Sequence, residues 1–538
     1  MRLMLKKYSA RLILCLLSGL LLALAFPKSD QGWLAWGALV PLLVALREVR
    51  PRAGFALAWS GGLAYNLAMM YWTVHSMYLY GKLPLFLAIM LLTLLAAYLA
   101  VFWGLYGLSL AWMCDRPWHM LVLSPLAWVA TEFLRAWLFT GFPWELLGYS
   151  QYQNLWVIQF ADLLGVYGVS ALIVWVNSVL ALALLHWLEK PWQGQPVSRS
   201  TVVRAGLMLA ISITAVAIYG ATRIHAVDRA AKKAKYAKVS VIQGNIDQAV
   251  KWDPSFQVLT TVKYKNMSLT DTVKGSDLII WPETATPFYF LHDKLLTRIV
   301  MEGIKASRAF YLIGSPSFSG TPGHYNYFNS AYLINPAGEV VGKYDKVHLV
   351  PFGEYVPLKR WLPFIHKMVA QVGDFKAGRR GATLRWQQHR LGMLICYEVI
   401  FPGLARAMVQ NGANLLVNIT NDAWFGRTSA AYQHFSMAVF RAVENRRSLA
   451  RAANTGISGF IDPCGRRIAM TRLFEQSEAT AEVALLDLPS TYTGWGDWPL
   501  ALLTFLFLLG AAGRRLMPKW PALSQRLRRT FPKWPGSN

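Results

Sequence analysis

Eight long apolar stretches constrain what this chain of 538 residues can fold into. They lie near 11–27, 32–46, 55–74, 84–113, 118–139, 163–187, 204–222 and 497–513. About 20 mostly apolar residues allow an α-helix to cross the hydrocarbon core of a bilayer. The stretches therefore predict a polytopic α-helical membrane protein with about eight transmembrane helices. The second stretch is short enough to be tilted or merged with a neighbour.

The distribution of charge predicts an orientation. Charged residues are only 15% of the chain, compared with about 25% in soluble domains, yet the net charge is +26. On such an apolar chain, this basic excess indicates cytoplasmic loops and anionic lipid rather than nucleic acid. Lys and Arg gather at the N-terminus, after the second and sixth stretches, and near the C-terminus. Both ends are therefore predicted to be cytoplasmic, although the basic residues within 223–238 oppose this orientation.

The predicted organisation has four parts. Residues 1–230 carry transmembrane helices 1–7, 236–490 form an extracytoplasmic domain, 495–515 form helix 8, and 516–538 are a basic cytoplasmic tail. Long domains cross the membrane largely regardless of their charge, which permits the external placement. As an alternative, the first stretch is a signal peptide cleaved near residues 23–25 (Ala-Leu-Ala). The domain would be external in that case too.

The segment 236–490 has a different hydrophobic pattern. Its apolar residues form short runs rich in β-branched side chains, each ended by Gly, Pro, Asn or a charge. Examples are YAKVSVIQGN, SDLIIWPE, FYLIGSP, AYLINPAG, LGMLICYE and ANLLVNIT. Helical patterns at 256–274, 293–308 and 431–450 alternate with these runs. Strands that alternate with helices predict a layered α/β domain.

Three motifs in this domain carry reactive side chains. WPETATP places Glu283 directly after an apolar run, and YDKVHLVPFGEYVP holds Lys346 and Glu354. LICYEVIFP places Cys396 at the end of another run, with Glu398 two residues later. The carboxyl ends of strands are where α/β sheets place their sites. The three motifs are therefore candidates for one active site.

These residue types suffice for acyl transfer through a thioester. A carboxylate can take the proton of a thiol as a general base, and a nearby ammonium favours the thiolate. The ammonium can also stabilise the oxyanion of a tetrahedral intermediate. This chemistry needs no metal and no cofactor, and we expect none.

Each of these residues also has a purely structural interpretation. A lone Cys in an apolar strand is usually a small buried side chain. Cys396 could also form a disulfide with Cys464 if the domain lies in an oxidising compartment. Lys346 beside Asp345 could be a surface ion pair worth about 0–1 kcal/mol. The three motifs in order, rather than any single residue, favour catalysis.

The forms WPE, K-x-H-L-x-x-F-G-E and C-Y-E resemble the nitrilase superfamily, and the segment NITNDAWFG is also similar to it. The resemblance implies that this domain is an α-β-β-α sandwich. It implies that Glu283 is the general base, Lys346 the oxyanion stabiliser and Cys396 the nucleophile. Glu354 would orient this triad, and the backbone N–H of Tyr397 would be the second oxyanion donor.

A nitrilase-like domain inserted among membrane helices resembles the bacterial apolipoprotein N-acyltransferases over nearly the whole chain. The segments GFPWELLGYSQ, VKWDP and FNSAYLI also match that family. The resemblance implies substrate contacts for Trp252, Asn329, Tyr397 and Glu398. It implies ping-pong transfer of an acyl chain from a phospholipid, expected to be phosphatidylethanolamine, to the N-terminal amine of S-diacylglyceryl-cysteine on an apolipoprotein. The enzyme would be a multi-pass protein of the bacterial inner membrane with its catalytic domain facing the periplasm.

Two other functions stay open at this point. A membrane-tethered nitrilase or amidase acting on a small C–N substrate would share the triad, but a tether needs one helix rather than eight. A transporter with an external domain would need paired charges inside the membrane, for which Glu132 and Arg135 are candidates. The segment PLKRWLPFIHKM (357–368) has the mixed aromatic and basic character of an interfacial element, or of an ordinary surface loop.

Overall fold

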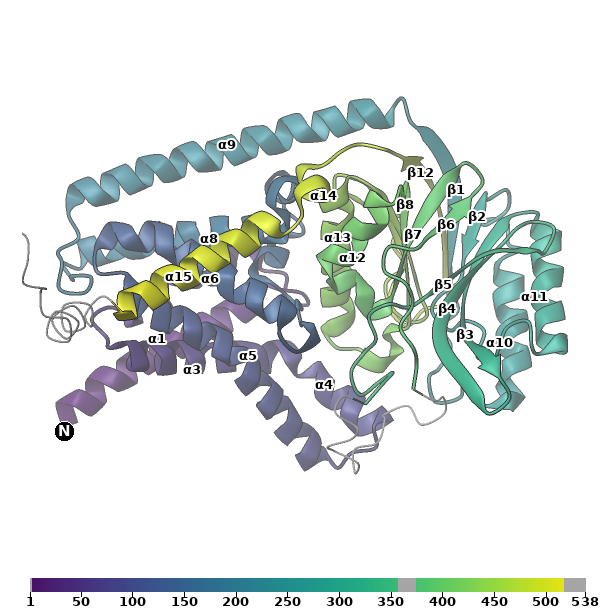
Figure 1. Ribbon diagram of the computed structural model, residues 1–538, viewed down its shortest axis with the longest axis horizontal. Helices are drawn as coiled ribbons and strands as arrows, with labels where there is room; N and C mark the ends of the chain where they lie inside the picture. Colours follow the sequence, from purple (N-terminus) through teal and green to yellow (C-terminus); the bar gives the residue numbers. More distant parts are fainter. Residues whose placement is uncertain (1, 357–373, 517–538) are drawn as a thin grey trace, which may run out of the picture.

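A bundle of helices and an α/β domain lie end to end in this protein (Figure 1). The computed structural model describes residues 2–356 and 374–516. The bundle contains the helices up to residue 231 together with the C-terminal helix, and the α/β domain is inserted between them. The predicted interfacial segment 357–368 and the tail after residue 516 lie outside the described residues.

All eight predicted apolar stretches are mainly helical. The long helices are α1 (Arg2–Leu24), α3 (Pro51–Met70), α5 (Leu85–Met113), α6 (Pro117–Trp137), α8 (Ala161–Trp187), α9 (Arg199–Ala231) and α15 (Trp498–Leu516). In the described residues, four helical segments are long and apolar enough to cross a membrane: Leu85–Met113, Pro117–Thr140, Ala161–Trp187 and Arg199–Ala231. Ser9–Leu24, Gly32–Ala45 and Trp498–Gly513 are apolar but shorter. The total of eight crossings therefore stays a prediction.

The second stretch does not form one continuous helix. A 3₁₀ turn, η1 (Gly32–Trp36), precedes a short helix, α2 (Val40–Ala45), in which Pro41 occupies the first turn. Proline fits that position because it has no N–H to donate. The stretch runs antiparallel to α1, since Ser18 Oγ donates to the carbonyl of Ala38 (2.6 Å) and Arg11 Nη1 donates to that of Arg47 (2.8 Å).

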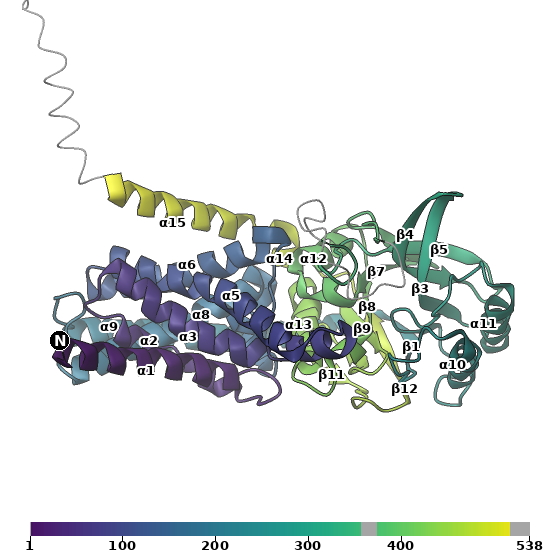
Figure 2. The same ribbon diagram turned by 90° about the horizontal axis from the view of Figure 1, so that it is seen from below.

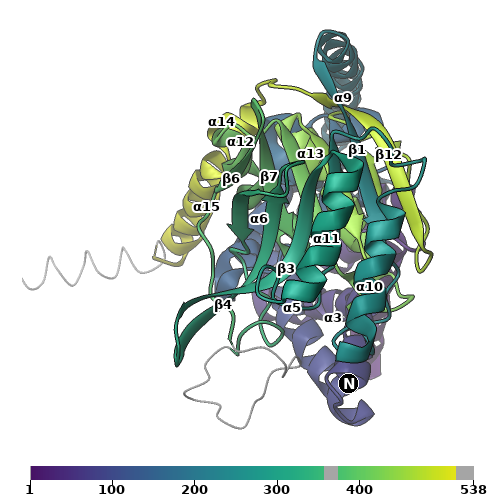
Figure 3. The same cartoon turned by 90° about the vertical axis from the view of Figure 1, so that its right-hand side faces the viewer.

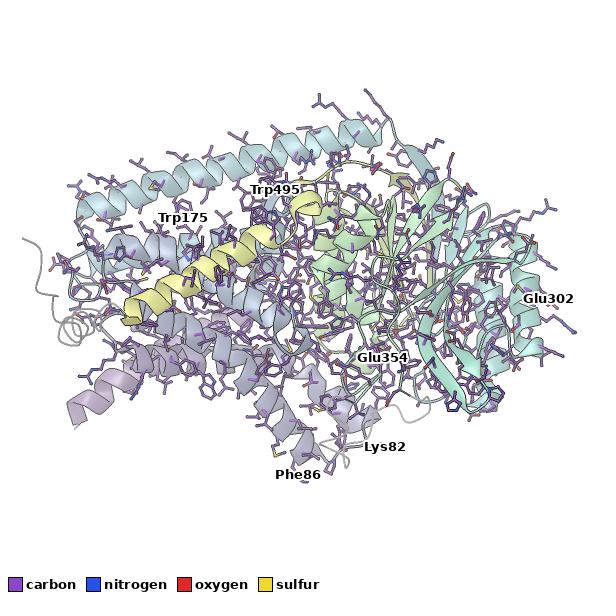
Figure 4. All side chains as sticks on the ribbon, in the orientation of Figure 1. Lys82, Phe86, Trp175, Glu302, Glu354 and Trp495 are labelled. Carbon is purple, nitrogen blue, oxygen red and sulfur yellow. The ribbon has the colours of Figure 1, made fainter. Side chains whose placement is uncertain are left out.

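Short elements connect the helices of the bundle. They are α4 (Trp72–His75), η2 (Ser76–Tyr80), η3 (Leu138–Thr140), η4 (Leu147–Gln151) and α7 (Leu155–Ile158), while α14 (Thr491–Trp495) connects the α/β domain to α15. The start of α5, near Lys82 and Phe86, projects away from the bundle (Figure 4). The Phe86 side chain is 73% exposed there, which suits contact with lipid.

The α/β domain is a four-layered sandwich, as predicted. Its two six-stranded sheets have the orders β12-β1-β2-β3-β4-β5 and β11-β10-β9-β8-β7-β6. Helices α10 (Pro254–Met267) and α11 (Lys294–Ser307) cover the first sheet (Figure 3). Helices α12 (Pro402–Gln410) and α13 (Ala430–Asn445) cover the second. The strands are β1 (Lys235–Gln243), β2 (Leu278–Ile280), β3 (Phe310–Thr321), β4 (His324–Ile334), β5 (Val340–Asp345), β6 (Thr383–Trp386), β7 (His389–Ile395), β8 (Leu415–Thr420), β9 (Ser448–Ala453), β10 (Gly459–Ile461), β11 (Arg467–Ile468) and β12 (Ser477–Leu485).

Strand direction decides which loops meet. Strands β1, β2 and β3 are parallel, and β5 has the same direction because two antiparallel pairings connect it to β3. Strands β7, β8 and β9 are parallel in the second sheet. The segments that follow β2 and β5 therefore leave the first sheet at the same end. Predicted catalytic residues lie in both of these segments.

Two predicted helices end earlier than the hydrophobic pattern suggested. The pattern at 256–274 forms a helix only to Met267, and the pattern at 431–450 forms one only to Asn445. Arg446 ends α13 in the left-handed conformation, with φ of 51°. The apolar residues after it belong to β9, so one hydrophobic pattern covered both elements.

Helix α13 lies between the second sheet and the bundle (Figure 2). Nearly all of its residues are buried. Beyond its end, Arg446 forms a buried ion pair with Asp162 of α8 (2.7 Å), and Arg223 of α9 reaches the same carboxylate (2.7 Å). The backbone N–H of Val166 donates to Glu444 Oε1 (3.0 Å). Charged and hydrogen-bonded contacts therefore fix the domain to the helices.

Candidate active site

The four predicted catalytic side chains meet inside the α/β domain. Glu283 follows β2, Lys346 follows β5, and Cys396 follows β7. All are buried, and so is Glu354, which Figure 4 marks within the domain. The Lys346 Nζ lies 3.0 Å from Glu354 Oε1 and 3.5 Å from Glu283 Oε1. Lys346 is therefore paired with two buried carboxylates and is not the surface pair considered as an alternative.

Asn329 of β4 joins the same two carboxylates. Its Nδ2 donates to Glu283 Oε1 and to Glu354 Oε1, each at 2.8 Å. The second oxygen of Glu283 accepts from the backbone N–H of Asn421 (2.9 Å). The second oxygen of Glu354 accepts from the N–H of Val350 (2.8 Å). Both acids are thus held in fixed orientations, and Asn329 contacts them directly.

Cys396 lies at a sharp turn from β7 into the 3₁₀ helix η5 (Cys396–Ile400), with φ of 51°. Burial raises the pKa of its thiol, the Glu283 carboxylate raises it further, and Lys346 opposes both effects. Burial alone would lower the pKa of Lys346, but Glu354 and Glu283 outweigh it and raise that pKa. The resting site therefore contains a neutral thiol beside an ammonium, so a base has to remove the thiol proton during attack.

The carboxyl group of Glu398 is fully enclosed by donors. It accepts from the backbone N–H groups of Val347 (2.6 Å) and Ile395 (2.7 Å) and from the hydroxyl of Tyr344 (3.1 Å). Burial raises the pKa of Glu398 to about 7, although the backbone hydrogen bonds and the charge of Lys346 oppose the shift. The contacts tie the backbone after Lys346 to the strand of the nucleophile. This geometry favours a positioning role for Glu398 over contact with substrate.

Two predicted substrate residues are half-buried aromatics. Trp252 follows Lys251 and is partly exposed. The ring of Tyr397 packs edge-on against Phe401 at 5.1 Å between ring centroids. It also faces Phe142, which comes from the bundle, at 6.4 Å. The residue beside the nucleophile therefore contacts both parts of the protein.

Several residues of the site were not predicted from the sequence. Lys251 is buried, with Nζ 3.3 Å from the carbonyl oxygen of Glu283; burial lowers its pKa to about 8 while Glu283 opposes the shift. Its position before the predicted Trp252 was the available signal.

Asp422 pairs with Arg451 (2.7 Å) and lies 3.0 Å from the ring of His434. Burial raises the pKa of Asp422, but Arg451 and His434 outweigh it and lower that pKa to about 2.

No disulfide joins Cys396 and Cys464, so the alternative that these two residues pair was wrong. Cys464 is buried in a separate apolar cluster with Val227 of α9 and Leu486. Within residues 2–356 and 374–516, no group of three or more His, Cys, Asp and Glu side chains could hold a metal ion.

The segment 141–151, which the sequence analysis singled out, contacts the domain behind the nucleophile. Trp144 Nε1 donates to Gln433 Oε1 of α13 (2.9 Å), and Ser436 Oγ donates to Glu145 Oε1 (3.1 Å). The hydroxyl of Tyr149 accepts from Arg441 (2.8 Å). This loop of the bundle is thus part of the packing around the site.

The fold and the site define a nitrilase-type domain of the carbon–nitrogen hydrolase class, built onto a bundle of apolar helices. A family model described as "Carbon-nitrogen hydrolase" matches residues 238–492, and one described as "Apolipoprotein N-acyltransferase N-terminal domain" matches residues 18–179. The chain belongs to the apolipoprotein N-acyltransferase family.

Relatives with that name match nearly the whole chain. The apolipoprotein N-acyltransferase of Geobacter metallireducens is 44% identical over 486 residues, which cover 90% of this chain and 91% of the relative. That of Methylococcus capsulatus is 34% identical over 499 residues, which cover 91% and 93%. Among solved structures, Saccharomyces cerevisiae Nit3, a nitrilase-superfamily member, is 18% identical with a TM-score of 0.35, covering 46% of this chain and 90% of Nit3.

Proposed function

We propose that the protein transfers a fatty acyl chain from a phospholipid to the free N-terminal amine of S-diacylglyceryl-cysteine on apolipoproteins. Family membership supports this activity. The structural observation that carries it is the continuity between the site and the helices. Tyr397, directly after Cys396, faces Phe142 of the bundle at 6.4 Å, and Trp144 packs behind the nucleophile. A site built partly from membrane segments suits two lipid substrates.

The acyl-enzyme would form in one displacement step. Glu283 accepts the thiol proton while the Cys396 sulfur attacks the carbonyl carbon of the phospholipid ester. The oxyanion is stabilised by the ammonium of Lys346 and the N–H of Tyr397. The intermediate then expels the alkoxide of the lysophospholipid, which takes the proton from Glu283. A thioester on Cys396 remains, and Glu354 and Asn329 keep Glu283 and Lys346 in place throughout.

The second displacement consumes the thioester. The neutral amine of the acceptor attacks the thioester carbonyl, and Glu283 accepts a proton from the amine as the new C–N bond forms. The thiolate of Cys396 leaves and is protonated again by Glu283. Water would compete with the amine, so the rings of Tyr397, Phe142 and Phe401 are proposed to exclude it from the acyl chain.

The membrane placement is part of the proposal. Seven crossings before the α/β domain and one after it, with both ends in the cytoplasm, would place the domain on the periplasmic side of a bacterial inner membrane. Four helices of sufficient length and apolar character support this arrangement, as does the run of the Gly32–Ala45 segment antiparallel to α1. The proposed parts are 1–230, 236–490, 495–515 and the basic tail 516–538.

The test is transfer between two defined lipids. The purified protein is incubated in mixed micelles with phosphatidylethanolamine, the proposed donor, and a synthetic S-diacylglyceryl-cysteine peptide with a free amine. We expect an N-acylated peptide and lysophospholipid in equal amounts. The same peptide with a blocked amine, and a Cys396→Ala variant, are the controls. Hydrolysis of short-chain amides without transfer would instead support the small-substrate amidase, and phosphatidylglycerol as a better donor would overturn the headgroup assignment.

A further inference from the structure

The proposed mechanism gives no part to His434, although its ring contacts the backbone of the nucleophile. His434 lies on α13 and is fully buried. Its Nε2 lies 3.1 Å from the carbonyl oxygen of Cys396. A carbonyl oxygen only accepts hydrogen bonds, so Nε2 carries a proton and donates it.

A buried network fixes the opposite edge of the same ring. The Nδ1 atom lies 3.0 Å from Asp422 Oδ1 and 3.1 Å from Arg451 Nη2. Arg451 Nη2 also donates to Asp422 Oδ2 (2.7 Å), and Thr420 Oγ1 donates to Asp422 Oδ1 (2.9 Å). The imidazole is thus held at both nitrogens, and its donor is aimed at one carbonyl.

The bundle supplies the remaining support. The indole of Trp144 is stacked on the imidazole of His434, with 5.7 Å between centroids and 18° between planes. Its Nε1 is anchored by Gln433, the residue before His434. Phe425 packs edge-on against the same imidazole at 5.9 Å. A tryptophan from the segment between α6 and η4 therefore fixes the orientation of a ring in the catalytic domain.

The carbonyl that accepts from His434 belongs to the peptide bond between Cys396 and Tyr397, and the N–H of that peptide bond is the proposed second oxyanion donor. The C=O of Cys396 and the N–H of Tyr397 are the two ends of one planar trans peptide, so they point in opposite directions. Holding the oxygen at His434 therefore also fixes the direction of the N–H. This peptide follows a residue with φ of 51°, a conformation that a non-glycine residue keeps only when its surroundings hold it.

We propose that His434 is a positioning residue, which holds the Cys396–Tyr397 peptide so that the Tyr397 N–H points at the oxyanion. Trp144, which is stacked on the His434 ring, connects this positioning residue to the membrane helices. The inference rests on the proposed function, because it assigns a part in the acylation of Cys396. It predicts that the site loses oxyanion stabilisation, rather than its nucleophile, when His434 is replaced.

Two reactions of Cys396 separate these effects. Acylation by phospholipid passes through an oxyanion, whereas alkylation by iodoacetamide is a displacement at carbon that forms none. His434→Leu is expected to slow acylation about 10²-fold, the effect of losing one oxyanion donor, while alkylation at the same pH keeps its rate. His434→Gln retains an N–H donor of similar reach, so its rate of acylation is expected to lie between the rates of the Leu variant and the unsubstituted protein. His389→Gln, at the opposite end of β7, is the matched control and should change neither rate.

Each outcome decides the proposal. An equal fall of both rates in His434→Gln would overturn it, because the residue would then support only the fold or the thiol. Unchanged acylation in both His434 variants would overturn it as well. If the Leu variant does not fold, Trp144→Phe provides the second test, with a smaller selective loss of acylation expected. Failure of the unsubstituted protein to become acylated would instead refute the proposed function.

Discussion

Replacing Lys346 by Met removes the ammonium that two buried carboxylates share. The Nζ lies 3.0 Å from Glu354 and 3.5 Å from Glu283, and the lysine side chain is 1% exposed. Coulomb's law with an effective dielectric constant of about 20 gives an attraction of about 5 kcal/mol for each pair. Desolvation of the charges offsets much of this attraction. Removal of one partner from a buried pair is therefore expected to lower the free energy of unfolding by about 3–5 kcal/mol.

The same substitution removes an oxyanion donor, and the two effects can be separated. Loss of one such donor lowers the rate of acylation by about 10²–10³. A second substitution, Glu354→Gln in the Lys346→Met background, removes one of the carboxylate charges left without a counterion. We expect this double variant to recover part of the stability but none of the rate, because no cation is restored near the thioester.

Thermal unfolding in detergent micelles reports the stability, and the mass of the acylated protein against time reports the rate. Lys346→Met should lower both the stability to thermal unfolding and the rate of acylation. The double variant should recover part of the stability but none of the rate. A Lys346→Met protein that keeps both properties would refute the ion-pair geometry. A double variant that regains the acylation rate would refute the assignment of Lys346 to the oxyanion.

Three further predictions concern the thiol, the other cysteines and the junction. The Glu283 carboxylate raises the pKa of the Cys396 thiol, so Glu283→Gln should lower that pKa; alkylation by iodoacetamide should then reach half its limiting rate at a lower pH, and an unchanged midpoint would contradict this. Cys15→Ser and Cys114→Ser replace thiols that are buried among the helices and should leave acylation unchanged; a large loss would show that the thiols are assigned wrongly. Arg446→Met breaks a buried ion pair at 2.7 Å, but Arg223 still pairs with the Asp162 carboxylate, so the expected loss in thermal unfolding is about 1–3 kcal/mol, the cost of buried acceptors left without a donor; an unchanged unfolding temperature would contradict these contacts.

Glu283 and Cys396 were predictable because each follows an apolar run, and Lys346 because it shares a motif with Glu354. Glu283, Lys346 and Cys396 come at the ends of β2, β5 and β7, and strand direction brings two of these ends to one edge of a sheet. Their spacing in short motifs also made the resemblance to a family specific. Asn329 and Glu398 were predicted to contact substrate, and only the structure shows their protein partners. Asn329 donates to Glu283 and Glu354, whereas Glu398 accepts from the Tyr344 hydroxyl and from the backbone on either side of the triad.

The supporting network was not predictable in the same way. His434 lies 38 positions from Cys396 along the chain and appears in the sequence as one more residue of an amphipathic helix. Only tertiary contacts, which bury the side chains, place Lys251, Asp422 and Arg451 in the site. Hydropathy also missed the break between η1 and α2, because an apolar 3₁₀ turn has the same composition as an apolar α-helix.

The central claim is that phospholipid acylates Cys396, and intact mass tests it most directly. The protein is incubated with phospholipid in the absence of any acceptor, and its mass is measured before and after treatment with neutral hydroxylamine. We predict a mass increase of one fatty acyl chain, located on the peptide that contains Cys396 and removed by hydroxylamine. A protein that gains no acyl group, while its Cys396 thiol still reacts with iodoacetamide, would contradict the thioester mechanism.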